Sequence, residues 1–460
     1  RIYKYIFKKL RFFKYNYSTK NIMLFHGQIF LFIFLPSVFC AYFLANKLTK
    51  IDTKIILIIS GLIFYSWWNI YLSPLIIISI FLNYFLSKLL INNKELSSKK
   101  KSLFVAIFLN VFFLIILKYL DFIILNINFL FASNFEYINL PFPLAISFVT
   151  FQTIAYLVDC YDGNIKKNTL SEYSLFIIFF PQLIAGPIVK YNNMMPQYKS
   201  AANKIINHKN IFLGLIVIFI GFFKKVIIAD NLALIVDDGF TNLESLEFFS
   251  SWLTSLAFTF QIYFDFSGYI DMATGSALLF NIKLPVNFDS PFKASSMIDF
   301  WRRWHITLSN FLMNYIYFPC LKSIKTVTFF KSMVVTFFVF IIAGIWHGPS
   351  WLYVIFGTLH GVGLIINHTF IKHFNFSFNK YISWFLTFNY VNFTLIFFRS
   401  KTIENSLDII QSMIGLNGLN IYMVLDKSLF LIFIFLLAII ITFCLKNSNY
   451  LVENYNKIIK

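Results

Sequence analysis

Two histidines in apolar surroundings are the residues of this sequence best suited to chemistry, and the first is His347. No charged side chain lies between Lys331 and Lys372, so His347 is expected at bilayer depth, where a titratable group usually has a function. Gly348 and Pro349 follow it and should end its helix, which favours a cavity beside the imidazole. An imidazole can take up a proton near neutral pH, so we predict that His347 is a catalytic general base. The alternative is a structural histidine bonded to a neighbouring helix.

The second histidine closes a run of basic and aromatic residues, Trp301-Arg302-Arg303-Trp304-His305. The guanidinium fork suits phosphate groups, and indoles stack on rings or anchor a chain at the membrane interface. We therefore predict that this run binds a phosphate-bearing donor at a portal, with His305 as a second catalytic residue. The alternative is an interfacial helix whose basic face meets anionic lipid head groups.

Three further residues are candidates for contacting the substrate. Gln261 and Asp265 are four positions apart and would share one face of a helix, and Trp346 directly precedes the first histidine. Asp271 would point elsewhere unless Gly268 kinks the segment between the two carboxylates. Paired acids could bind an ion or orient a histidine, but buried aspartates more often bond the backbone or an arginine. A structural role is therefore the favoured interpretation of the carboxylates.

A third histidine, His360, is a weaker candidate. It follows His347 by thirteen positions, which at about 100° per residue puts the two on different faces of any continuous helix. The sequence contains no Walker A loop, no Gly-x-Ser-x-Gly and no His-Glu-x-x-His. We expect no metal site and no bound cofactor.

The composition is that of a membrane protein. Of the 460 residues, 58% are hydrophobic, 21% aromatic and only 13% charged, with a mean hydropathy of +0.72. No soluble globular domain has this composition. The formal net charge is +19, but the basic residues flank apolar segments instead of covering one face. This pattern fits the positive-inside rule better than a nucleic-acid surface, so no nucleic-acid partner is expected.

The apolar segments predict an all-α polytopic protein with about eleven transmembrane helices plus re-entrant helices, because one crossing takes about 20 apolar residues. The segment 179–187 contains two prolines and a glycine, so it should line a cavity or lie buried among other helices. The segment 283–325 mixes charges with aromatics, as interfacial or re-entrant helices do. The expected apolar segments are 24–45, 55–71, 73–92, 102–118, 122–132, 144–160, 211–229, 248–264, 268–281, 330–346, 350–370, 382–398 and 428–445.

The lysine-rich connections set the expected orientation in the membrane. Segments 47–54 and 88–101 should be cytoplasmic, and the uncharged turn between them should lie outside. This orientation would put residues 1–22 outside, although they are strongly basic. We therefore expect that Met23 is the biological start, that 1–22 is a basic extension without native structure, and that 23–460 forms a single membrane domain.

The histidine motifs resemble those of the membrane-bound O-acyltransferase (MBOAT) family. The resemblance extends from about Met23 to the last span. The bacterial branch that contains the membrane subunit of alginate O-acetylation, together with its peptidoglycan O-acetylation relatives, is the most similar. The motifs that carry the resemblance are Trp301–Ser309, Trp346–Gly348 and Leu359–Gly361, with support from Ser147–Gln152, Pro181–Pro187 and Asp265–Met272.

This resemblance implies a ring of helices around a central funnel, with His347 at the family's catalytic position and His305 at its second signature histidine. It implies that the acyl donor is cytosolic acetyl-CoA or a carrier-protein thioester. In this branch the acetyl group passes outward to a separate extracytoplasmic esterase-like transferase, which modifies alginate or peptidoglycan. The implied location is the bacterial inner membrane, where membrane lipid surrounds the protein.

Three other functions compete with this one. The teichoic acid D-alanylation branch shares the histidines, but it fits the sequence around Gln152 and His360 less well. A glycan-precursor transporter also needs polar residues and broken helices, but it predicts internal repeats and a string of midplane charges, and the sequence shows neither. A structural scaffold for a secreted transferase would not explain two histidines in helix-breaking contexts.

Overall fold

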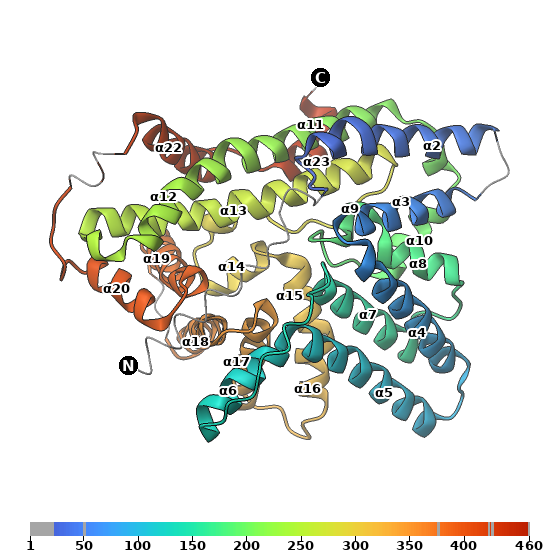
Figure 1. Cartoon of the computed structure of the whole chain (residues 1–460), viewed down its shortest axis with the longest axis horizontal. Helices are drawn as coiled ribbons and strands as arrows, with labels where there is room; N and C mark the ends of the chain where they lie inside the picture. The colour runs from blue at the N-terminus through green and yellow to red at the C-terminus, as the bar shows by residue number, and fades with distance from the viewer. Residues whose placement is uncertain (1–22, 49–51, 375–377, 422–423, 425–426, 459–460) are drawn as a thin grey trace.

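The computed structural model shows a helical protein, and within the described part of the chain every regular element is a helix. Figure 1 shows the longer helices arranged around the middle of the molecule, where the short helices α14 (Met297–Arg303) and α15 (Ile306–Leu312) lie. The predicted extension at 1–22 falls outside the described residues. Those residues are 23–48, 52–374, 378–421, 424 and 427–458.

The helices form three groups in chain order. The first group contains η3 (Ile29–Phe34), α2 (Leu35–Leu48), α3 (Thr53–Trp68), α4 (Ser73–Asn92), α5 (Leu96–Leu114), η5 (Ile115–Tyr119), α6 (Leu120–Phe131), α7 (Ile146–Tyr161), α8 (Leu170–Ile178), α9 (Phe180–Leu183) and α10 (Tyr191–Lys199). The second contains α11 (His208–Phe222), η7 (Phe223–Ala229), α12 (Asp230–Thr241) and α13 (Phe248–Leu279). The third contains α14, α15, η10 (Met313–Tyr317), α16 (Phe318–Lys322), α17 (Phe329–His347), α18 (Trp351–His373), α19 (Lys380–Arg399), α20 (Ile403–Met413), α22 (Leu429–Cys444) and α23 (Ser448–Ile458).

The all-α membrane architecture is confirmed, but the count of about eleven crossings is not. Seven helices in the described ranges are long and apolar enough to cross a membrane, or eight if one bent pair counts as a single span. Some expected spans are parts of one longer helix, because the chain continues through η5 and η7 without a break. The seven are Ile29–Lys47, Ile70–Asn92, Leu96–Phe131, His208–Thr241, Phe329–His347, Trp351–His373 and Lys380–Arg399.

The two spans expected at 248–264 and 268–281 are instead one continuous helix, α13, so Gly268 does not kink it. A Cβ on Gly268 would lie 2.7 Å from the carbonyl oxygen of Gly221 on α11. The glycine therefore allows two helix backbones to approach closely, as small residues do in membrane interfaces. On this uninterrupted helix, Asp265 and Asp271 have different partners. Asp271 forms a buried ion pair with Lys224, at 2.6 Å, which agrees with a structural role.

The predicted helix break after His347 is confirmed. Helix α17 ends at His347, and α18 begins at Trp351 after a short turn. The two helices pack closely where a Cβ on Gly344 would lie only 2.3 Å from the carbonyl oxygen of Tyr353. His347 is thus the last residue of one helix, at the point where the chain turns back.

The interruption predicted at 179–187 is also confirmed, since α8 ends at Ile178 and only the single turn α9 follows. The carbonyl of Phe176 loses its helical partner there. The side-chain amides of Gln152 and Gln182 both donate to this carbonyl, at 2.6 and 2.5 Å. The two glutamines therefore satisfy the broken end of α8 inside the protein, as a non-helical backbone at membrane depth requires.

Candidate active site

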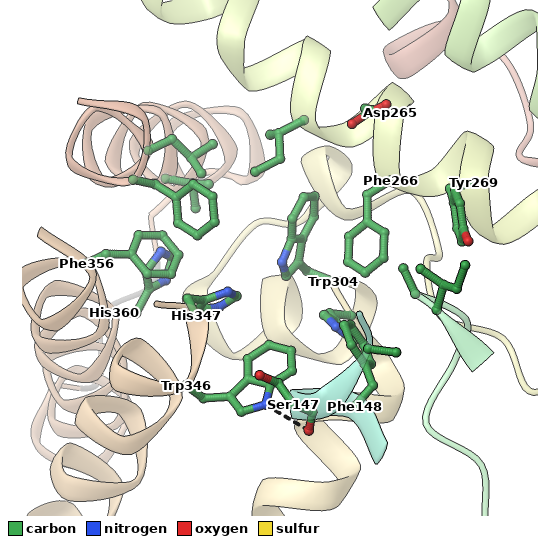
Figure 2. Close-up of a pocket in the computed structure, with 18 of the residues that line it drawn as sticks. Ser147, Phe148, Asp265, Phe266, Tyr269, Trp304, Trp346, His347, Phe356 and His360 are labelled. Atoms are coloured by element: carbon green, nitrogen blue, oxygen red, sulfur yellow. Dashed lines mark hydrogen bonds between the residues drawn. The ribbon is translucent and has the colours of Figure 1, made fainter. Parts of the chain in front are cut away.

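A cavity of about 520 Å³ lies where α7, α13, α14, α17, α18 and α19 meet, and its wall is mostly aromatic and aliphatic. Figure 2 shows His347 between Phe356 and His360 on one side and Trp304 on the other. All three histidines singled out in the sequence line this one cavity. Its polar groups come from Lys118, Ser147, Asp265, Tyr269, Trp304, His305, Trp346, His347 and His360.

The imidazole of His347 is held by aromatic rings. The centroids of the Trp346 and Phe398 rings lie 5.0 and 5.1 Å from it, and that of Phe356 lies at 5.7 Å. Neither ring nitrogen forms a hydrogen bond with any residue that the structure describes. The apolar rings fix the orientation of the imidazole and leave both nitrogens available to a substrate in the cavity.

The helix end that carries His347 is held by two residues that sequence reasoning missed, Lys118 and Tyr119. The Lys118 ammonium donates to the carbonyl of Trp346 at 2.5 Å and lies 3.4 Å from that of His347. The Tyr119 hydroxyl donates to the carbonyl of Ile345 at 2.6 Å. The last carbonyls of a helix have no partner within it, and a cation there complements the helix dipole. Lys118 and Tyr119 therefore fix the backbone on which His347 sits.

Lys118 also contacts α7, since its ammonium lies 3.1 Å from the hydroxyl oxygen of Ser147. It stands in η5, a π-helical turn within a long apolar span, and such turns are frequent at functional sites. The only signal in the sequence was a lysine at the end of an expected span. Its partners on α17 are more than two hundred residues away along the chain, so no local pattern could reveal those contacts.

His305 is buried and lies between α14 and α15 with φ 43° and ψ 53°. This left-handed conformation is uncommon for a residue with a side chain. Its Nδ1 lies 3.2 Å from the side-chain oxygen of Asn287, a residue that the sequence reasoning also missed. Burial, and then the neighbouring His347, lower the pKa of His305 to about 3. The imidazole is therefore neutral at physiological pH.

His360 faces the same cavity because a new helix begins after His347, so the argument from one continuous helix does not apply. Both of its nitrogens have partners. The Trp301 indole N–H donates to Nδ1 at 3.2 Å, and Nε2 lies 2.9 Å from the hydroxyl of Thr394. That hydroxyl donates its own hydrogen to the carbonyl of Val391, so it accepts from Nε2. His360 thus has no free lone pair and links α14, α18 and α19.

The three tryptophans predicted to contact the substrate have different positions. Trp346 and Trp304 line the cavity. The Trp346 indole N–H lies 3.4 Å from the carbonyl of Ser147 (Figure 2). Its ring stacks on Phe151, with centroids 5.2 Å apart. Trp301 is buried behind the wall, where its N–H is used by His360.

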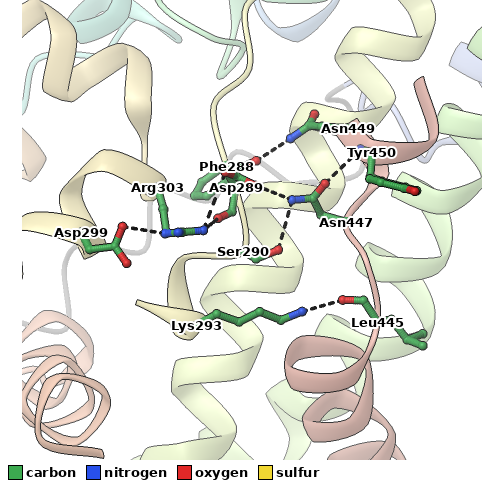
Figure 3. Close-up of polar contacts among 10 residues, drawn as sticks. All are labelled: Phe288, Asp289, Ser290, Lys293, Asp299, Arg303, Leu445, Asn447, Asn449 and Tyr450. Atoms are coloured by element: carbon green, nitrogen blue, oxygen red, sulfur yellow. Dashed lines mark hydrogen bonds and ion pairs between the residues drawn. The ribbon is translucent and has the colours of Figure 1, made fainter. Parts of the chain in front are cut away.

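The two arginines predicted to form a phosphate-binding portal do not line the cavity. Arg302 is exposed. Arg303 is half-buried and donates to Asp299 at 2.8 Å, with a second carboxylate, that of Asp289, at 3.8 Å (Figure 3). Arg303 therefore ties α14 to the segment that precedes it, and a portal role for either arginine stays a prediction.

Asp265 and Gln261 lie on the same helix, but only one of them lines the cavity. Asp265 lines the cavity and forms an ion pair with Lys225 at 2.6 Å. Gln261 is not part of the cavity wall, and its side-chain oxygen is buried without a partner in the described structure. Within the same residues, no group of three or more histidine, cysteine, aspartate or glutamate side chains is placed to hold a metal ion.

Comparisons with known proteins point to one family. The model of the family described as MBOAT, membrane-bound O-acyltransferase family, matches residues 62–407. The chain is 40% identical to a peptidoglycan O-acetyltransferase of Helicobacter pylori, over 94% of this chain and 91% of that protein. It is 32% identical to a probable alginate O-acetylase of Pseudomonas syringae pv. tomato, over 83% and 73%. A teichoic acid D-alanyltransferase of Streptococcus thermophilus is 29% identical over 50% of this chain and 57% of its own.

Proposed function

The chain belongs to the membrane-bound O-acyltransferase family and is a multi-pass membrane O-acyltransferase. From this we propose that it transfers acetyl groups for the O-acetylation of an extracytoplasmic polysaccharide. Peptidoglycan is the first choice of polymer, since a peptidoglycan O-acetyltransferase matches the chain almost from end to end. An alginate-like polymer is the second choice.

The observation that carries this proposal is the state of the three histidines. One imidazole, that of His347, forms no hydrogen bond with the described residues and is surrounded by aromatic rings. The second, His305, is neutral and has one nitrogen bonded. The third, His360, is fully bonded. A base must have a free lone pair within reach of the substrate, so His347 is the base that the cavity supports best.

The proposed step is a direct acyl transfer. The Nε2 or Nδ1 atom of His347 accepts the proton of the attacking hydroxyl, and the hydroxyl oxygen forms a bond to the carbonyl carbon of the thioester. The carbon–sulfur bond then breaks, and the imidazolium returns its proton to the departing sulfur. The products are an acetyl ester and a free thiol. The mostly apolar wall keeps water away from the thioester, which protects it from hydrolysis.

The proposed donor is acetyl-CoA or an acetylated carrier protein on the cytoplasmic side of the bacterial inner membrane. The proposed partner is a separate extracytoplasmic esterase-like transferase, which receives the acetyl group and modifies the polymer. The protein needs no bound cofactor in this scheme, because the donor thioester brings the activated acetyl group.

A reconstituted system tests this proposal. The purified protein is placed in liposomes together with the extracytoplasmic transferase of its own organism. Radiolabelled acetyl-CoA, an acetylated carrier protein or a D-alanyl carrier protein is supplied as donor, and peptidoglycan fragments are the final acceptor. We expect acetyl transfer that His347→Gln removes and that the control variant His368→Gln, whose side chain is outside the cavity wall, retains. Transfer of D-alanine in place of acetate, or equal acetyl transfer by His347→Gln, would overturn the proposal.

A further inference from the structure

We propose that Asn287 is a positioning residue that fixes the ring of His305, so that its Nε2 accepts a hydrogen bond from a non-reacting O–H or N–H group of the bound substrate. This inference rests on the proposed function and adds a substrate contact to it. His347 then deals with the reacting hydroxyl, and His305 holds a second polar group of the same substrate.

Asn287 contacts both the side chain and the backbone around His305. Its side-chain oxygen accepts from the backbone N–H of Thr307 at 3.1 Å and from the Thr307 hydroxyl at 2.8 Å. The same oxygen lies 3.2 Å from Nδ1 of His305. Its backbone carbonyl accepts from the N–H of Ile306 at 2.9 Å. Asn287 therefore binds three consecutive residues of the chain that carries the histidine.

These contacts determine where the proton of His305 sits. A backbone N–H can only donate, so the atom of Asn287 that faces the N–H of Thr307 must be the oxygen. That oxygen can only accept, so Nδ1 of His305 must carry the hydrogen that points at it. A neutral imidazole has one N–H, and the other nitrogen is then a lone pair. In His305 the lone pair is therefore on Nε2. His305 lines the cavity, and its Nε2 forms no hydrogen bond with the described residues.

The backbone around Asn287 is braced from a distant part of the chain. The carbonyl of Phe288 accepts from the side-chain amide of Asn449 at 2.6 Å, and that of Asn447 donates to Asp289 at 2.7 Å (Figure 3). A left-handed conformation such as that of His305 is strained and persists only where the surroundings enforce it. These two bonds hold the segment that carries Asn287, the residue that contacts His305.

A lone pair at Nε2 accepts only from a donor, which an acceptor polysaccharide offers in its hydroxyls and a thioester donor in its amide N–H groups. The charged and titratable groups that share the cavity with His305 are His347, His360, Lys118, Asp265 and Tyr269. None of them is hydrogen-bonded to Nε2. The position is therefore open for a substrate group.

Asn287→Asp and Asn287→Leu test the inference, with Thr307→Val as the matched control. Asp keeps the oxygen acceptor and the Nδ1–H form, whereas Leu has a similar size and no acceptor. We expect Leu to lower kcat/KM by roughly 10- to 100-fold, as loss of an orienting partner does for other histidines. Asp should retain more activity than Leu at pH 8. Thr307→Val should lower thermal stability but keep the wild-type pH profile, because the backbone N–H of Thr307 remains.

The pH profile separates orientation from simple packing. A carboxylate beside the imidazole favours its charged form, so the pKa of His305 should be higher in the Asp variant than in the wild type. As pH falls through this raised value, Nε2 becomes protonated and its lone pair is lost. We expect the activity of Asn287→Asp relative to wild type to fall between pH 8 and pH 4.5.

Two results would overturn the inference. One is an Asn287→Leu variant with wild-type kcat/KM. The other is an Asn287→Asp variant that is no more active than Asn287→Leu and has the same pH profile as the wild type. If the Leu variant does not accumulate in the membrane, the pH profile of the Asp variant decides alone. Failure of the proposed function is distinguishable, because His347→Gln would then keep the transfer activity. Failure of this inference alone leaves His347→Gln inactive.

Discussion

Replacing Lys118 with methionine should slow acetyl transfer without preventing membrane insertion. Methionine has a similar length and no hydrogen-bond donor. The change removes the ammonium from the carbonyls of Trp346 and His347 and from the hydroxyl of Ser147, while the bond from Tyr119 to Ile345 remains. Of the three carbonyls at the end of α17, only that of Ile345 then keeps its side-chain donor.

The size of the effect follows from these contacts. A hydrogen bond from a charged group is worth about 1.5–3 kcal/mol. Lys118 makes one short bond of this kind, to the carbonyl of Trp346, and the other two are longer. We assume that this free energy holds His347 in its reactive position. About 1.4 kcal/mol corresponds to a tenfold change in rate, so kcat should decrease roughly 10- to 150-fold. KM should change little, because a positioning contact is lost and not a substrate contact.

The assay is the initial rate of acetyl transfer by the protein in liposomes, at matched protein amounts and with varied donor concentration. Lys118→Arg should recover part of kcat because it keeps a cationic donor. Tyr119→Phe removes one neutral bond of about 0.5–1.5 kcal/mol and should cost about tenfold at most. A Lys118→Met variant with normal kcat, or with a raised KM alone, would refute the reasoning that this lysine acts through His347.

Two further variants test other parts of the structure. Lys224→Met leaves Asp271 buried without its counter-charge, so the protein in detergent should lose about 3–5 kcal/mol of stability, measured as a lower unfolding temperature. Adding Asp271→Leu should restore much of this stability. Additive losses in the double variant would contradict a paired role. His360→Ala should lower stability by about 1–3 kcal/mol, because two buried polar groups lose their partner, and should reduce kcat least of the three histidine variants. A stable His360→Ala protein without activity would assign that histidine to the chemistry.

The sequence predicted those features that depend on neighbours in the chain. The break after His347 follows from Gly348 and Pro349, and the interruption near Pro181 follows from its own prolines. The weak rating of His360 agrees with its two hydrogen bonds, but its location did not follow from helical periodicity, because the periodicity ends at the break.

The features that the sequence did not reveal depend on contacts between distant segments. Lys118 reaches the end of α17 from the first third of the chain. Gly268 allows the backbone of Gly221 to approach α13 closely, and the helix continues through it without a break. Arg303 is paired with Asp299 and Asp289 outside the cavity, although its sequence suits a phosphate site equally well. In each case the sequence shows the residue type, but it does not show which distant residue is the partner.

The central claim, that His347 is the general base, is tested most directly by O-acetylation of peptidoglycan in a deletion strain that produces His347→Ala, with membrane abundance checked by blot. Proton transfer by a positioned group is worth about 10²–10⁴ in rate. We predict a loss of at least about 10²-fold at wild-type abundance, with His368→Gln near wild type and His347→Gln as inactive as the alanine variant. Normal acetylation by His347→Ala at wild-type abundance would contradict the claim.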